Sequence, residues 1–160
     1  MNEIILAASI LMGASPIEVV KEVLRLEIAY VAMDFSADPF SEEALERLYS
    51  EDFADAYNEI MRLMEERNEP LLDGDPITGH QEYCALSGLT ADEGVITQTT
   101  ATVTVSFGSQ WCLEGAPPEV IGEVTTIVFH LSREDDRWVI DDFEHSLYGS
   151  FRAVLMELRD

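Results

Sequence analysis

The sequence predicts an α+β fold, in which N-terminal helices pack on a curved antiparallel sheet and a short C-terminal helix follows. Apolar residues recur with the helical period through about residue 67, and polar and apolar residues alternate after about residue 80. Turn-forming residues lie between the two parts, at 72–79. Helices followed by strands are typical of α+β domains. The 160 residues fit one domain, 1–160, which is long enough to bury a core.

Residues 15–18 carry the signals of a helix start. Ser15 suits the cap, Pro16 suits the first turn, and Glu18 completes a capping box. We expect this helix to run to about Met33. Its apolar positions are Ile17, Val20, Val23, Leu24, Leu26, Ile28, Tyr30 and Val31. Their spacing predicts an amphipathic helix with one buried face.

Two further helices are expected before the central loop. One runs from Ser41 to about Tyr49, and the next is capped near Ser50 and runs to about Arg67. The inward positions of the latter are Phe53, Ala56, Tyr57, Ile60, Leu63 and Met64. Pro70 ends the helical part of the chain.

Four strands are expected in the second half, at 82–89, 95–107, 123–132 and 138–143. Residues 91–94 are expected to turn between the first two strands, 115–118 form a loop, and 134–136 a hairpin turn. A terminal helix is expected at 150–158. The sequence contains no repeats, linkers or low-complexity segments.

The charge balance is the largest departure from an ordinary composition. The chain has 32 acidic and 9 basic residues, a net charge of −23. Such a charge disfavours nucleic acids and anionic membrane surfaces as direct partners, and it favours a basic protein partner or simply high solubility. No metal-ligand spacing and no phosphate-binding loop are present, so no cofactor is expected.

The N-terminal segment and the two cysteines leave the location of the protein open. Residues 4–14 have the length of a signal-peptide core, but no Lys or Arg precedes them. We expect a packed N-terminal helix and a cytoplasmic protein, with export to the periplasm as the alternative. The segment is too short to span a bilayer. Cys84 and Cys112 are expected to pair if the protein is exported, and otherwise to be small buried residues.

The order of elements and the motif Trp138-Val139-Ile140-Asp141-Asp142 resemble the nuclear-transport-factor-2-like superfamily of cystatin-like α+β proteins. An uncharacterised bacterial branch resembles this chain most, through Asp75-Pro76, Gln81 and the terminal Ser-x-Arg-x-x-Leu at 150–155. The resemblance implies a cone-shaped fold that often encloses a pocket. It implies no particular activity, because folds of this kind host enzymes, ligand binders and interaction modules.

The carboxylates behind the last strand are the first candidates for chemistry. Alternation along a strand places Asp141 and Asp142 on opposite faces, and puts Asp142 with Trp138 and Ile140. If the protein is an enzyme, Asp142, His80 and Tyr83 are the candidate catalytic residues, and Trp138, Ile140 and Phe129 line the pocket. The favoured alternative is that Asp142 is a structural acceptor at the strand end, for example near Arg152.

The acidic helix after Ser50 is the second candidate. Glu51, Asp55 and Glu59 recur every four residues and therefore share one helix face. The candidate binding residues are Glu51, Asp52, Asp55, Glu59, Glu65 and Glu66. A solvated face with an acidic first turn explains the same pattern.

These observations favour a non-catalytic acidic protein that docks on a basic protein surface, as an immunity protein or an inhibitor does. One alternative is a small-ligand pocket protein or an acid/base isomerase or hydrolase of the same fold. Another is an exported envelope protein. A homodimer is compatible with each of these hypotheses.

Overall fold

The computed structural model describes residues 13–81, 84–108 and 123–160 of the chain. Its helices are α2 (Pro16–Val31), the short 3-10 helix η1 (Phe35–Ala37), α3 (Glu42–Leu48), α4 (Glu51–Arg67) and α5 (Phe151–Arg159). Its strands are β1 (Ser87–Ile96), β2 (Thr100–Gly108), β3 (Val124–Glu134), β4 (Arg137–His145) and β5 (Gly149–Ser150). Expected elements at 1–12 and 115–118 lie outside the described residues.

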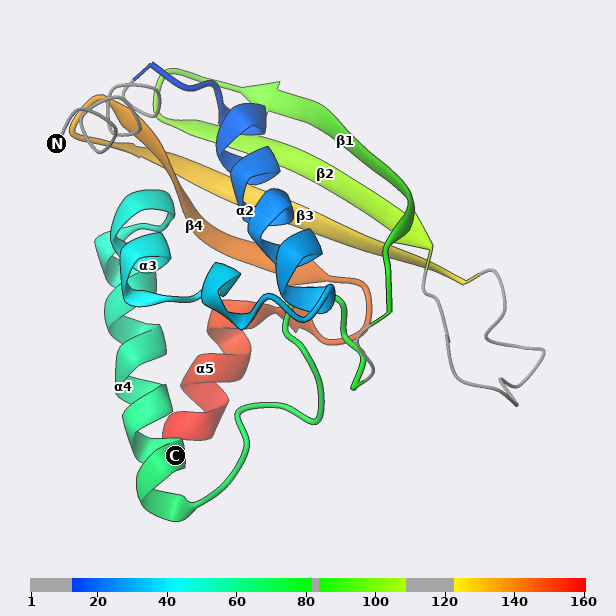
Figure 1. The fold of residues 1–160 in the computed structure, drawn as a ribbon. Helices are drawn as coiled ribbons and strands as arrows, with labels where there is room; N and C mark the ends of the chain where they lie inside the picture. Colours follow the sequence, from blue (N-terminus) through cyan, green and yellow to red (C-terminus); the bar gives the residue numbers. More distant parts are fainter. Residues whose placement is uncertain (1–12, 82–83, 109–122) are drawn as a thin grey trace, which may run out of the picture.

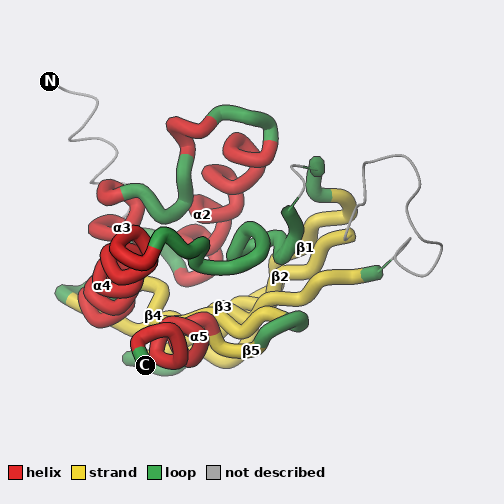
Figure 2. The backbone as a smooth tube through the Cα atoms, turned by 90° about the horizontal axis from the view of Figure 1, so that it is seen from below, coloured by secondary structure: helices red, strands yellow, loops and turns green. Residues whose placement is uncertain are grey.

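The five strands form one antiparallel sheet in the order β1-β2-β3-β4-β5. Each strand therefore pairs with its neighbours in the sequence (Figure 1). The helices gather on one face of this sheet, with α5 over β4 and α2 crossing towards β1 (Figure 2). The predicted α+β fold, with its C-terminal helix, is confirmed.

Serine side chains cap the N-termini of four helices. Ser15 Oγ accepts a hydrogen bond from Glu18 N, and the Glu18 carboxylate accepts one from Ser15 N at 2.7 Å, which completes the predicted capping box. Ser41, Ser50 and Ser150 cap α3, α4 and α5 in the same way. These caps depend on residues three positions apart, so they follow directly from the sequence.

The core lies between the helices and one face of the sheet. Alternate residues of the central strands are buried there: Ala101, Val103, Val105 and Phe107 of β2, and Thr125, Ile127, Phe129 and Leu131 of β3. Both buried faces are those that alternation predicts. The helical layer contributes a cluster of aromatic rings: Phe40, Phe53 and Phe151 pack against Phe143 of β4, and Tyr49 packs on Phe40 and Phe53.

The first hairpin turns later than the sequence predicts. Residues 91–94 continue β1, which keeps its register with β2 through Glu93 and shifts it before Ile96, and the chain turns at 97–99 instead. Thr97 closes this turn, because its Oγ1 accepts hydrogen bonds from Thr99 N at 3.3 Å and Thr100 N at 3.0 Å. A turn closed by threonine lacks the glycine and asparagine that usually mark hairpins. The residues around Gly94 carry such a turn signal, although they lie within β1.

Candidate functional site

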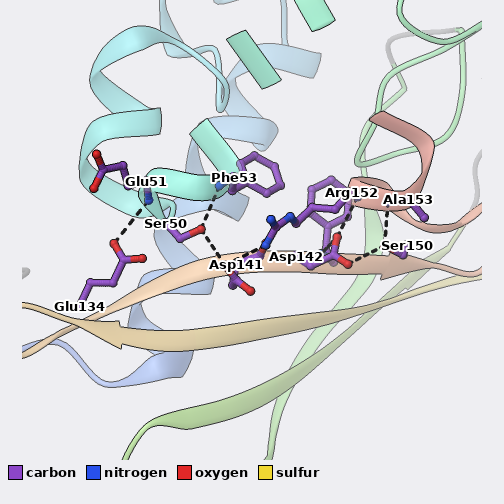
Figure 3. Close-up of polar contacts among 10 residues, drawn as sticks. Ser50, Glu51, Phe53, Glu134, Asp141, Asp142, Ser150, Arg152 and Ala153 are labelled. Carbon is purple, nitrogen blue, oxygen red and sulfur yellow. Dashed lines mark hydrogen bonds and ion pairs between the residues drawn. The ribbon is translucent and has the colours of Figure 1, made fainter. Parts of the chain in front are cut away.

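The two adjacent aspartates of β4 each hold the start of a helix. Ser50, the cap of α4, donates a hydrogen bond from Oγ to Asp141 at 2.8 Å. Ser150, the cap of α5, donates one to Asp142 at 2.6 Å. Both pairs lie along the same strand (Figure 3). Each of the two adjacent aspartates therefore orients one serine cap.

Arg152 contacts both aspartates from the first turn of α5. Its guanidinium lies 3.1 Å from Asp141 Oδ1, and its backbone N–H donates to Asp142 Oδ1 at 3.0 Å (Figure 3). Asp142 is thus the structural acceptor near Arg152 that the sequence offered as the favoured alternative.

The expected sharing of a face by Asp142 and Ile140 is wrong. Leu131 pairs with Ile140 and Phe129 with Phe143, and a β-bulge inserts Asp141 between these pairs. An inserted residue shifts the alternation by one position, so Ile140 and Phe143 both face the core. Strict alternation therefore fails at the motif that the sequence analysis relied on.

The three predicted pocket residues lie within or beside the packed core. Phe129 and Ile140 are fully buried in it. Trp138 is partly buried against the core, with the Arg133 guanidinium 5.4 Å from its ring centroid. None of the three is a lining residue of the cleft, the recess or the groove described below.

His80 does line a cleft, while Tyr83 lies outside the described residues. The cleft has a volume of about 490 Å³ and is bounded by the 72–81 loop and the link between β4 and β5. Its lining residues are Leu72, Asp73, Gly74, Asp75, Gly79, His80, Gln81, Leu147 and Tyr148. An adjoining recess is lined in part by Tyr30 of α2.

Asp75 forms a tight turn on the wall of this cleft. Its Oδ1 accepts hydrogen bonds from Ile77 N at 2.7 Å and Thr78 N at 3.0 Å. Its backbone exchanges further bonds with the loop, donating to His80 O and accepting from Gly79 N. The turn therefore fixes the Asp75 carboxylate without help from a ligand.

His145 and Tyr148 attach this turn to the end of β4. His145 Nε2 donates to Ile77 O at 2.9 Å, while its Nδ1 accepts from Leu147 N at 3.1 Å. Both ring nitrogens of neutral His145 thus have a hydrogen-bond partner. Burial lowers the pKa of His145, which favours this neutral form. Tyr148 stacks on His145 with ring centroids 4.6 Å apart and donates to Pro76 O. The cleft wall is thus preorganised.

A buried glutamate that the sequence analysis did not single out lies behind Asp75. Glu27 of α2 is 0% exposed, and neither of its carboxyl oxygens makes a hydrogen bond to a described residue. Ile28, predicted to face inward, is 46% exposed instead. Glu27 lies four residues from both Val23 and Val31, which are buried. An acidic residue on the apolar stripe was the signal that could have identified it.

Several oxygen-bearing side chains surround Glu27. The pKa of Glu27 is raised to about 9, mainly by burial. The neighbouring carboxylates of Asp75 and, to a smaller extent, Asp38 raise it further. Burial also raises the pKa of Tyr49, whose hydroxyl makes no hydrogen bond to a described residue, and that of Tyr57. Glu27 therefore holds its proton at neutral pH, and a protonated carboxyl group is far less costly to bury than a carboxylate.

The acidic residues of α4 divide into paired and unpaired ones. Glu59 forms an ion pair with Arg159 at 2.9 Å, and Glu66 with Arg62 at 2.7 Å. The four others, Glu51, Asp52, Asp55 and Glu65, make no ion pair with a described residue. The ion pair of Glu59 with the C-terminal helix was not visible in the sequence, since the partners are 100 residues apart.

A groove of about 490 Å³ gathers carboxylates from three elements. They are Glu42 and Glu46 of α3, Glu51 of α4, and Glu134 and Asp135 of the β3–β4 hairpin. None of these five is ion-paired with a described residue. Arg137, the groove's basic residue, instead donates to the backbone oxygens of Glu46 and Arg47. We call this surface the acidic groove.

Other features of the described residues bear on the class of protein. No described helix is long and apolar enough to cross a membrane. The described part of the chain holds no group of three or more side chains arranged for a metal ion. Cys84 is disulfide-bonded, and Cys112, the second cysteine of the sequence, lies outside the described residues.

No protein-family model and no curated protein sequence matches this chain. The structure itself defines the class, an α+β protein with helices on one face of a five-stranded antiparallel sheet.

Proposed function

We propose that this protein is a non-catalytic acidic binding protein that docks on a basic protein surface, as an immunity protein or an inhibitor does. The acidic groove is the observation that carries this proposal. Five carboxylates from α3, α4 and the β3–β4 hairpin converge on it without ion-pair partners among the described residues. A lysine or arginine side chain entering the groove would supply the missing charge.

The groove combines charge with apolar surface. Leu45, Tyr49 and Ala54 contribute to its lining beside the carboxylates. The backbone N–H of Glu51 at the start of α4 already donates to Glu134 at 3.4 Å, which holds the hairpin tip against the helix (Figure 3). A defined recess of this kind favours a specific partner over diffuse solvation of an acidic face. The net charge of −23 would speed association with a basic protein.

Neutralising the groove is expected to weaken partner binding selectively. The test variant carries Glu46→Gln, Glu51→Gln and Glu134→Gln, and the matched control carries Asp92→Asn, Glu93→Gln and Glu157→Gln on other surfaces. Pull-downs from the native host's lysate at low and high salt should recover a basic protein with the wild type and the control. The groove variant should bind that protein at least about tenfold more weakly, a loss of about 1.4 kcal/mol.

Two outcomes of this experiment would contradict the proposal. One is that no basic protein is recovered at any salt concentration. The other is that the control variant loses the partner as fully as the groove variant does, since net charge alone would then explain the binding.

The disulfide bond of Cys84 favours a second candidate, an exported envelope protein. Disulfides persist mainly in oxidising compartments such as the bacterial periplasm. An exported protein made by its own host is expected to lack the residues before about Ser15, which N-terminal sequencing measures. An intact Met1-Asn2-Glu3 end would exclude a cleaved signal.

The relationship to the nuclear-transport-factor-2-like superfamily is likewise a proposal. The five-stranded antiparallel sheet, the helices on one face and the helix after Trp138-Val139-Ile140-Asp141-Asp142 support it. Such a relationship would leave the activity open, because this superfold hosts many functions.

A further inference from the structure

We propose that the open edge of strand β1 binds an extended segment of a partner protein. The segment adds a strand to the sheet, places an apolar side chain between β1 and α2, and presents a carboxylate to Lys21. This surface is separate from the acidic groove, since the two have no lining residue in common. The inference therefore does not rest on the proposed docking function.

β1 forms an open edge of the sheet in the described part of the chain. It pairs with β2 on one side, and no backbone hydrogen bond joins it to a described residue outside β2 (Figure 1). Alternate backbone N–H and C=O groups of an edge strand point away from the sheet and can pair with another chain. Residues 92–96 are exposed, so this edge is accessible to a partner.

The edge suits a short segment rather than a long strand. The register of β1 with β2 is continuous from Thr90 to Glu93, and it shifts on either side of this stretch. Register shifts and charged residues along an edge limit indiscriminate pairing with other sheets. The regular stretch between the two shifts is therefore where we expect a partner strand to pair.

A cleft of about 290 Å³ lies between this edge and α2, and we call it the edge cleft. Ala91 pairs with the buried Val105, so it lies on the side of β1 that faces the helices. Every second side chain of an added strand would point to that side and enter the cleft. The lining residues are Lys21, Leu24, Arg25, Ile28, Leu89 and Ala91.

Ile28 provides an apolar contact that the protein itself leaves open. It was predicted to face the core, yet it lines the edge cleft with 46% of its surface exposed. Ile28 lies four residues after Leu24 and seven after Lys21, so the three share one face of α2. An aliphatic side chain of the partner would cover Ile28 and remove apolar surface from water.

The charge of the edge cleft selects the partner. Lys21 and Arg25 line the cleft, and none of its lining residues is acidic. Arg25 already forms an ion pair with Glu22 at 2.7 Å, whereas Lys21, the one lysine of the chain, forms none with a described residue. Lys21 is therefore the group to which we expect a carboxylate of the segment to bind.

A second copy of this chain fits the edge less well than a segment of another protein. Antiparallel pairing of two β1 edges would bring Asp92 and Glu93 close to the same residues of the other copy. Each chain also carries a net charge of −23, which opposes self-association. A short segment with a single acidic residue avoids the first of these costs and reduces the second.

Titration of the full chain with a capped heptapeptide tests the proposal. The probe is acetyl-Thr-Val-Thr-Leu-Thr-Glu-Thr-amide, in which Val, Leu and Glu share one face of an extended chain. Backbone NMR reports where the peptide binds. We expect the amide signals of residues 21–28 and 89–96 to shift, and those of residues 42–51 at the acidic groove to stay unchanged.

Two N-methylated peptides distinguish strand addition from binding through side chains alone. One carries methyl groups on the backbone nitrogens of Leu and Glu, and the other on those of the two threonines that precede them. Only one alternate set of N–H groups in a strand faces its neighbour. One peptide should therefore bind at least about tenfold more weakly than the probe, while the other stays within about threefold of it.

Protein variants test the two side-chain contacts. Ile28→Gln should weaken binding at least about fivefold. Lys21→Gln and a probe with Gln in place of Glu should each weaken it about threefold, and both changes together no more than either alone. Arg62→Gln, an exposed basic position on α4, is the matched control and should leave the affinity unchanged.

Three results would overturn the inference. The first is the absence of shifts at residues 89–96 with millimolar peptide. The second is equal affinity of the two N-methylated peptides, because no strand would then be added. The third is protection of every amide from Thr90 to Glu93 against hydrogen exchange in the free protein, because a second copy or another part of the chain would then already cover the edge.

Discussion

Glu27→Gln is expected to unfold less readily than the wild-type protein at pH 7. Glutamine keeps the size of the side chain and carries no titratable proton. Its amide is uncharged at every pH, as the protonated carboxyl group is. The wild-type protein, by contrast, must hold a proton on Glu27 that the unfolded chain releases at neutral pH.

The sign and the pH window follow from the two pKa values of Glu27. The pKa is about 9 in the folded protein and 4.5 in the ordinary reference. Below pH 4.5 both states bind the proton, so the stability contributed by protonated Glu27 is fully present. That stability is lost as pH rises towards 9, at about 1.4 kcal/mol per pH unit. At pH 7 the loss amounts to about 3 kcal/mol.

Urea unfolding of wild type and variant between pH 5 and pH 9 measures this difference. The free-energy advantage of Glu27→Gln should grow across the range and level off near pH 9. Glu157→Gln, an exposed position on α5, is the control and should differ from wild type by less than about 0.5 kcal/mol. An advantage that does not change with pH would mean that Glu27 titrates normally.

Phe143→Ala is expected to lose about 3–5 kcal/mol of folding free energy. Phe143 is fully buried, and its ring stacks on Phe151 with centroids 4.8 Å apart. It also packs near Phe53 and Phe129, at centroid distances of 6.2 and 5.6 Å. Removing the ring leaves a cavity where the sheet, α4 and α5 meet, and a rigid cluster collapses little around it.

Phe143→Leu is the matched control, because it keeps most of the volume and should lose less than about 2 kcal/mol. Urea midpoints with an unchanged dependence on denaturant concentration provide the measurement. A loss below about 1 kcal/mol for Phe143→Ala would show that the aromatic cluster is not closely packed.

Local signals explain which elements the sequence predicted well. The capping box of Ser15 and the serine caps of the other helices lie within three residues of their partners, so the helix starts were found almost to the residue. The faces of β2 and β3 followed from simple alternation. The β1–β2 turn was misplaced because Thr97 closes it with a side chain that no turn motif announces.

The site was harder to predict, because it depends on contacts between distant segments. Glu27 and Asp75 lie 48 positions apart in the numbering and meet only when α2 packs beside the loop. The carboxylates of the acidic groove come from three elements, of which the sequence analysis nominated only Glu51. The bulge at Asp141 likewise arises from pairing with β3, which local alternation does not register.

The position of Asp141 has a consequence for how the chain is completed during synthesis. Ser50 and Asp141 are separated by 91 residues, so the cap of α4 meets its acceptor only after most of the chain has been made. Contacts of such long range slow folding, because a large loop must close first. We expect α4 to dock late on the nascent chain, once β4 has been made and Asp141 can accept the hydrogen bond from Ser50.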